Sequence, residues 1–180
     1  MFISLFKLYN LIYYIRFTFA LIGNGLIKSE FKNNNNKEGN NMSVNKEYFL
    51  EQCKMFCKNT LMETLGIEFI EVGDDYLKAS MPVNKIVHQP MGLLHGGASV
   101  ALAESVGSSA SFLFIDPTKQ EVRGIEISAN HLKSKKEGMV YGTARIIHKG
   151  RTLHLWEVRI TDEEDQLISL CKITNIVINK

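Results

Sequence analysis

The sequence predicts one α+β domain in which an antiparallel sheet wraps around a single long helix. Residues 95–114 carry a wide apolar face at helical spacing, which is typical of an enclosed helix. Two strand-like segments precede this helix and four follow it. Short turns join consecutive strands, and such turns are typical of antiparallel pairs.

One amphipathic helix is expected before the sheet begins. Residues 45–64 repeat apolar side chains at spacings of mostly three and four, as one face of a helix does. The strand-like segments lie between turns such as Gly73-Asp74-Asp75 and Lys149-Gly150-Arg151, and residues 84–94 form a loop ahead of the long helix. The expected strands cover residues 66–71, 76–83, 121–132, 139–148, 152–161 and 166–178.

The long helix is expected to end before Asp116-Pro117, because proline disfavours helical backbone at the residue before it. Its apolar positions cover more than half of its circumference, so other structure must enclose most of it. Its many Gly, Ala and Ser residues allow a sheet to approach closely. The continuous apolar face consists of Val100, Ala103, Gly107, Ala110 and Phe114, widened by Leu102, Val106 and Leu113.

The composition excludes several classes of protein. The formal net charge is +2, and residues 42–180 are close to neutral, so no nucleic-acid partner is expected. Cys53, Cys57 and Cys171 contain no Cys-x-x-Cys pair, which argues against a disulfide framework and a structural zinc site. We therefore expect no bound metal and a reducing, cytoplasmic location.

Residues 1–41 differ from the rest of the chain, because an Asn-rich tract follows a segment rich in Phe, Ile, Leu and Tyr. Arg16 interrupts the apolar core that a signal peptide needs. The longest uncharged run is eleven residues, against the roughly 20 of a membrane span. Lys37-Glu38-Gly39 is what a translated ribosome-binding site ahead of Met42 would encode. We expect residues 1–41 to be disordered or foreign to the natural protein, with a membrane anchor as the alternative, and the domain to comprise residues 42–180.

Glu104 is the one charged residue between His95 and Asp116. Ser108 follows it by one helical turn and lies on the same face. A glutamate that faces water is the simple alternative, but the neighbours of Glu104 are small or apolar. A lone acid in such surroundings is desolvated, which is typical of a functional site. The sequence therefore favours a functional carboxylate at this position.

The segment from Gln89 to Gly97 is a polar, glycine-rich entry to the long helix. A helix start offers unpaired N–H groups and a partial positive charge, which suit a thioester carbonyl that becomes an oxyanion. Gly96 and Gly97 let a ligand approach the backbone closely. No Gly-Lys-Ser/Thr follows, which excludes a nucleotide P-loop, and no Gly-x-Ser-x-Gly supports a serine hydrolase. A glycine-rich turn without a ligand is the alternative.

His95 and Glu104 are nine residues apart, which places them on opposite sides of one helix. They cannot easily share a site within one chain. A twofold symmetric dimer solves this, because the helix start of one subunit then faces the acid of the other. The sequence thus predicts an obligatory dimer with two equivalent sites.

Polar and basic residues gather at two turns in the second half of the chain. Lys133, Ser134 and Lys135 follow one strand, and Lys149 and Arg151 lie in a hairpin turn. Such residues most often form solvated surface. They suit the phosphates of coenzyme A equally well.

The stretch from Gln89 to Ser108 resembles the hotdog-fold acyl-CoA thioesterases of the phenylacetate-type branch, in particular the 1,4-dihydroxy-2-naphthoyl-CoA hydrolases of menaquinone synthesis. The resemblance covers residues 45–178. It implies a hotdog fold, a dimer of dimers with sites shared between subunits, and hydrolysis of an aromatic or related acyl-CoA without a cofactor. The densest blocks are Gly92 to Val100, Leu102 to Ser105 and Gly124 to His131.

The resemblance also implies roles for individual residues. Glu104 would be the nucleophile or the general base of the hydrolysis. The Gly96 N–H would stabilise the oxyanion, aided by Gln89 and His95. The residues that would contact the substrate are Ser108, His131 and Gly97.

Two departures from the family pattern concern specificity. Met91 stands where relatives often carry an aromatic residue, and Leu132-Lys133 replaces a more usual Val-Arg, so the acyl group and the contacts to coenzyme A stay open. A non-enzymatic acyl-CoA sensor and a dehydratase are the competing functions on the same fold. The intact acid at Glu104 disfavours the sensor, and dehydratases carry a different histidine-containing loop.

Overall fold

The computed structural model describes residues 46–180. The expectations for residues 1–41, and the domain boundary at Met42, lie outside these residues. The chain order is two short helices, two strands, one long helix and four strands. From the first strand onward this is the order that the sequence predicts.

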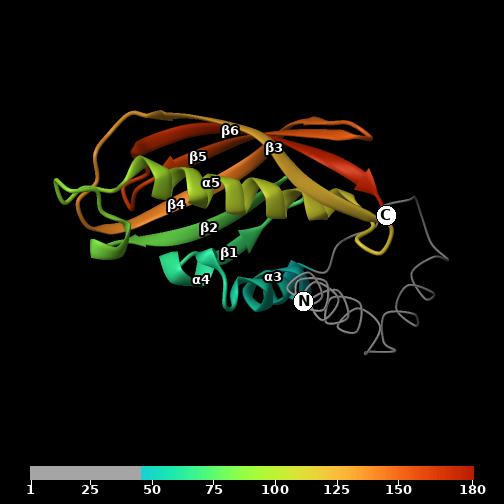
Figure 1. The fold of residues 1–180 in the computed structure, drawn as a ribbon, viewed down its shortest axis with the longest axis horizontal. Coiled ribbons are helices and arrows are strands. Elements are labelled where there is room, and N and C mark those ends of the chain that lie inside the picture. The colour runs from blue at the N-terminus through green and yellow to red at the C-terminus, as the bar shows by residue number, and fades with distance from the viewer. Residues whose placement is uncertain (1–45) are drawn as a thin grey trace, which may run out of the picture. The chain divides into compact units, whose positions relative to one another are not determined.

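Six strands form one antiparallel sheet in the order β1-β2-β4-β5-β6-β3, and α5 lies across one face of it (Figure 1). The predicted α+β architecture is confirmed, and the strand ends agree with the expected ones within two residues. The strands are β1 (Glu68–Val72), β2 (Tyr76–Val83), β3 (Gln120–His131), β4 (Gly138–Lys149), β5 (Leu153–Thr161) and β6 (Leu167–Asn179).

The prediction of a single helix over residues 45–64 is wrong in one respect, because the structure has two helices in this segment. α3 covers Lys46–Cys57 and α4 covers Leu61–Leu65. Between them Asn59 adopts a left-handed backbone, and Thr60 caps α4 by accepting a hydrogen bond from the Met62 N–H at 3.2 Å. This local capping outweighs the apolar periodicity that continues through the break.

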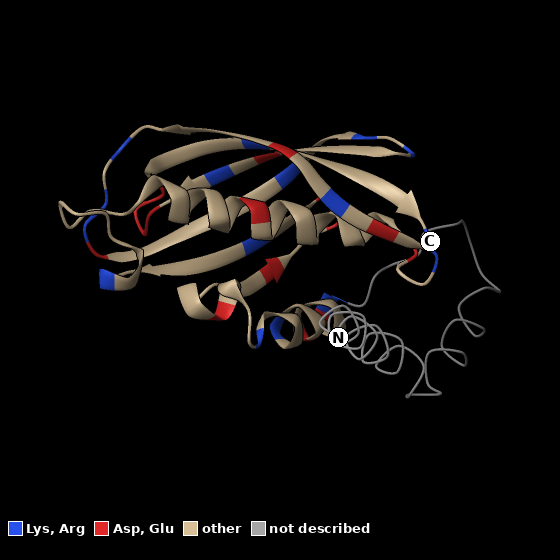
Figure 2. Cartoon of the chain, in the orientation of Figure 1, with Lys and Arg blue, Asp and Glu red and all other residues tan. Residues whose placement is uncertain are grey.

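The long helix α5 (Gly96–Ala110) continues into a 3₁₀ turn, η2 (Ser111–Phe114), and ends close to where the sequence predicts. A second 3₁₀ turn, η1 (Lys85–Val87), interrupts the loop expected before it. Figure 2 shows a single acidic segment in α5, which is Glu104. The rest of the helix is uncharged, as an element packed on a sheet requires.

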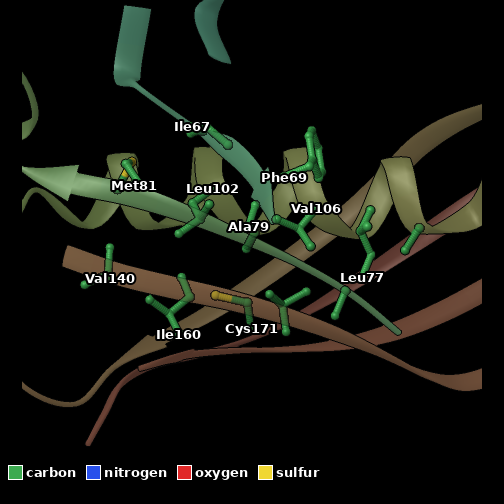
Figure 3. Close-up of a cluster of buried hydrophobic side chains, with 14 of the residues drawn as sticks. Ile67, Phe69, Leu77, Ala79, Met81, Leu102, Val106, Val140, Ile160 and Cys171 are labelled. Atoms are coloured by element: carbon green, nitrogen blue, oxygen red, sulfur yellow. The ribbon is translucent and has the colours of Figure 1, made fainter. Parts of the chain in front are cut away.

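The core lies between α5 and the sheet (Figure 3). Small residues bring the two layers together. A Cβ atom on Gly107 would lie 2.4 Å from Ile173 Cγ2, and one on Gly142 would lie 3.1 Å from Leu102 Cγ. Glycine at these positions is therefore what allows α5 to rest on β4 and β6.

The two edges of the sheet differ. β1 has five residues, and α3 packs against it. β3 has twelve residues, several of them exposed, and within residues 46–180 its one strand partner is β6. A long unpaired edge is a template for another strand. No helix in this part of the chain is long and apolar enough to cross a membrane.

Candidate active site

The start of α5 leaves one backbone donor free. His95 is the N-cap, and its Nδ1 accepts the Gly97 N–H at 2.8 Å. The His95 carbonyl accepts the N–H groups of Ala98 at 2.9 Å and Ser99 at 3.3 Å. Among residues 46–180 no acceptor takes the N–H of Gly96. The predicted oxyanion donor is thus unpaired, while the N–H of Gly97 is already used.

His131, at the end of β3, lies against the same turn. A Cβ atom on Gly96 would lie 2.6 Å from His131 Nε2, so a side chain at Gly96 would displace this ring. On its other side, His131 Nδ1 lies 2.9 Å from the hydroxyl of Ser169. Gly96, His131, Ser169 and Gln89 line one cavity of about 210 Å³, and we call these four residues the helix-start cluster.

Gln89 joins this cluster through a tight turn. Its carbonyl accepts the Gly92 N–H at 2.9 Å, and Gly92 has a left-handed backbone with φ of 74°. The Gln89 Oε1 atom accepts the N–H of Met91. Among the described residues no acceptor takes the NH₂ group of Gln89, so this group is available to a ligand in the cavity.

A second cluster lies in the middle of α5. The hydroxyl of Ser108 donates to Glu104 Oε1 at 3.0 Å, as their one-turn spacing predicts. A Cβ atom on Gly124 of β3 would lie 2.3 Å from the same Oε1, so glycine makes room for the carboxylate. The pairing of β3 with β6 shifts register here, between Gly124 and Glu126. Glu104, Ser108, Gly124 and Asn175 form what we call the mid-helix cluster.

A buried polar network supports this second cluster. Asn175 Nδ2 donates to the Gly107 carbonyl at 3.0 Å and to Ser111 Oγ at 2.8 Å. Trp156 Nε1 donates to the same Ser111 Oγ at 2.9 Å. Asn175, Ser111 and Trp156 have no exposed surface.

Sequence reasoning missed Gly124, Ser169 and Asn175. Asn175 carries a signal, because it alternates with the buried apolar residues Ile173 and Val177 and therefore points inward. A glycine inside a strand, such as Gly124, signals a bulge or a close approach.

The two clusters are separate within one chain. Gly96 and Glu104 are eight residues apart on α5, which is about 12 Å along its axis. Gly96 lies beside His131 of β3, whereas Glu104 lies beside Gly124, seven residues earlier on that strand. The structure therefore brings Gln89, Gly96 and His131 together, and separately Glu104 and Ser108. His95 caps the helix beside the first group, so its Nε2 is the ring nitrogen left for a ligand.

Comparison with known proteins decides the family. The sequence profile of the thioesterase superfamily matches residues 91–169. The 1,4-dihydroxy-2-naphthoyl-CoA hydrolase of Escherichia coli is 41% identical over 129 residues, which are 72% of this chain and 94% of that protein. The chain belongs to the thioesterase superfamily.

Other members of this superfamily are equally similar. A proofreading thioesterase of Cronobacter turicensis is 44% identical over 71% of this chain and 93% of its own length. The crystal structure of a Pseudomonas aeruginosa thioesterase, with one glutamine replaced by alanine, superposes with a TM-score of 0.71 at 44% identity. That match covers 73% of this chain and 94% of the other. The predicted hotdog fold is confirmed, and the chain is a thioester hydrolase.

The residues predicted to hold coenzyme A do not form one group in this thioesterase chain. Lys133, Ser134 and Lys135 lie beyond the His131 end of β3. Lys149 and Arg151 line a separate cavity of about 330 Å³ that includes Gln120, at the other end of β3. A strand of twelve residues spans roughly 35 to 40 Å, which explains the separation.

Lys135 differs from the other four, because acids already pair with it. Its Nζ lies 2.5 Å from Glu163 Oε2 and 3.8 Å from Asp162 Oδ2. The hydrogen bond to Glu163 raises the pKa of Lys135. The same bond, with one from the Met139 N–H, lowers the pKa of Glu163 to about 2. This group ties the β5–β6 turn to the segment after the helix-start cluster.

Cys53, Cys57 and Cys171 are free and buried. Burial raises the pKa of Cys53 to about 12 and that of Cys171 to about 11, so these thiols stay protonated at neutral pH. Among residues 46–180 no three His, Cys, Asp or Glu side chains gather to hold a metal ion.

Proposed function

We propose that this thioesterase hydrolyses an acyl-CoA to the free acid and coenzyme A, with Glu104 as nucleophile or general base. The observation that carries the proposal is the presence of two different functional groups at two places on α5. The helix start holds a Gly96 N–H that has no acceptor in the described part of the chain, and the middle holds a carboxylate that accepts a hydrogen bond from Ser108. Hydrolysis of a thioester needs both an oxyanion donor and an attacking group.

The reaction follows from these two groups. As general base, Glu104 takes a proton from water while the water oxygen bonds to the thioester carbon, and the carbonyl oxygen becomes an oxyanion. The Gly96 N–H, aided by the helix dipole, stabilises that charge. When the C–S bond breaks, coenzyme A leaves as a thiolate and takes up a proton. As nucleophile, Glu104 would instead form a mixed anhydride that water then cleaves.

The site is completed by a second copy of the chain. Within residues 46–180 the outer edge of β3 has no strand partner, so its backbone N–H and C=O groups can pair with β3 of a second subunit. Antiparallel pairing about a twofold axis exchanges the two ends of the strand, so the helix-start cluster of one subunit approaches Glu104 of the other. A dimer of dimers, as the family resemblance implies, repeats this arrangement.

The same pairing unites the cations predicted to hold coenzyme A. Lys133 and Ser134 of one subunit come beside Lys149 and Arg151 of the other, because these groups lie at opposite ends of β3. Cations and hydroxyls suit the phosphates of the coenzyme. Lys135, paired with Glu163, contributes least to this group.

An aromatic acyl group is the substrate class that we propose. The relative from Escherichia coli is named for 1,4-dihydroxy-2-naphthoyl-CoA, which supports an aromatic acyl-CoA and a place in menaquinone synthesis. The small cavity beside His131 and Gly96 suits the thioester carbonyl rather than a long chain.

A panel of acyl-CoA thioesters tests the proposal. Dihydroxynaphthoyl-, benzoyl-, phenylacetyl- and fatty acyl-CoA are incubated with the full chain, and thiol release is followed. We expect turnover, fastest with an aromatic acyl group and lost in Glu104→Gln. Glu68→Gln, an exposed acid on β1, is the matched control and should keep full activity. Binding of these thioesters without thiol release would support the sensor and contradict the proposal.

A further inference from the structure

We propose that Asn175 is a positioning residue, which keeps the Ser108 hydroxyl beside Glu104 by giving it a second acceptor while the Glu104 carboxyl is uncharged. The inference rests on the proposed role of Glu104 and extends it to a residue buried in β6. Asn175 does not contact Glu104 in the structure, and it acts through Ser108.

The orientation of the Asn175 amide is determined by its neighbours. The Gly107 carbonyl can only accept, so the atom 3.0 Å from it must be the NH₂ group. The second amide hydrogen points to Ser111 Oγ at 2.8 Å. Trp156 Nε1, which can only donate, occupies the same oxygen at 2.9 Å and fixes Ser111 as an acceptor. The amide oxygen of Asn175 therefore faces Ser108.

Ser108 has one hydroxyl proton and two acceptors. Glu104 Oε1 lies 3.0 Å from its Oγ, and Asn175 Oδ1 lies 3.4 Å from it. While Glu104 is ionised, the charged oxygen is the stronger acceptor and takes the proton. Once the carboxyl takes a proton from water, or bonds to the acyl carbon, Oε1 is a weaker acceptor. The hydroxyl can then turn to Asn175, so its proton keeps an acceptor.

The burial of Asn175 makes its hydrogen bond with Ser108 matter for the position of the hydroxyl. Asn175 has no exposed surface, and Ile173 and Val177 at the neighbouring inward positions of β6 are buried and apolar. Water cannot reach Asn175, so its amide oxygen depends on the partly buried Ser108 hydroxyl for a hydrogen bond. A simple tie between α5 and β6 is the alternative role for Asn175, through its bond to Gly107.

A double-mutant cycle separates the two roles. The rate constant kcat, KM and the melting temperature are measured for Asn175→Leu, Ser108→Ala and the double variant, with a good acyl-CoA substrate from the panel. We expect Asn175→Leu to lower kcat roughly tenfold with KM within about twofold, as for directly coupled neighbours. In the Ser108→Ala background the same change should leave kcat unaltered, while the melting temperature falls equally in both backgrounds.

If Asn175 only joins α5 to β6 through its bond to Gly107, the double-mutant cycle gives a different result. If Asn175→Leu lowers kcat by the same factor with and without Ser108, the inference is overturned. Asn179→Leu, an exposed asparagine at the end of the same strand, is the matched control and should keep kcat. If Asn175→Leu does not fold, Asn175→Val is smaller, suits a strand and carries the same comparison.

The outcome is distinguishable from a failure of the proposed function. Turnover of Glu104→Gln within tenfold of wild type would remove the premise, whatever Asn175 does. An inactive Glu104→Gln combined with additive effects at Ser108 and Asn175 would overturn this inference and leave the function intact.

Discussion

The two clusters on α5 differ in what they offer and in what holds them. The helix-start cluster offers donors, above all the Gly96 N–H, and the residues around Gly96 (His95, Gly97 and His131) are exposed. The mid-helix cluster offers an acid, and behind it Asn175 is fully buried. In our proposal one helix therefore separates the oxyanion donor from the attacking acid. The proposed site then needs two helices, and the edge of β3, unpaired within residues 46–180, is where a second chain can supply one.

The largest effect is expected at the acid of the mid-helix cluster. Glu104→Gln keeps the size and the contact with Ser108 but removes the base or nucleophile, so kcat should fall roughly 10³-fold, about 4 kcal/mol of barrier. Thiol release under substrate saturation measures it. Turnover within about tenfold of wild type, roughly 1.4 kcal/mol, would remove Glu104 from the mechanism.

The helix-start cluster is tested by a pair of substitutions at one residue. Both Gly96→Ala and Gly96→Pro add a Cβ atom near His131, but the proline also removes the N–H. Proline is tolerated at the first position of a helix, and the extended backbone of His95 suits a following proline. We expect kcat of the proline variant to be about 10²-fold below that of the alanine variant. Equal values in the two variants would exclude the Gly96 N–H as oxyanion donor.

The smallest effect is expected at the ion pair beside the helix-start cluster. Glu163 has its pKa lowered to about 2 by Lys135 and the Met139 N–H, so its stabilising effect is present above its ordinary pKa of 4.5 and disappears as the pH falls toward 2. Glu163→Gln should lower the melting temperature by a few degrees at pH 7 and by less at pH 3. If the difference in melting temperature between wild type and Glu163→Gln is as large at pH 3 as at pH 7, this explanation is contradicted.

The fold was largely predictable from local patterns. Strand ends follow from turns such as Gly73-Asp74-Asp75, and the end of α5 follows from its apolar face and Asp116-Pro117. The break between α3 and α4 was not predicted, because a cap at Thr60 competes with an uninterrupted apolar pattern.

The site was predictable only in part. Glu104 and Ser108 meet because helix geometry determines contacts four residues apart. His131 reaches Gly96 across 35 positions of sequence, and the family resemblance, rather than spacing, indicated it. Gly124 and Asn175 depend on the register between β3, β6 and α5, which a single sequence does not determine.

The most direct test of the shared site mixes two inactive variants. Glu104→Gln has an intact helix start, and Gly96→Pro has an intact acid. When equal amounts are unfolded and refolded together, half of the helix starts and half of the acids are intact, so random pairing should restore about one quarter of the wild-type activity. Each variant refolded alone should stay inactive. A mixture no more active than the mean of its two components would show that each chain builds its site alone.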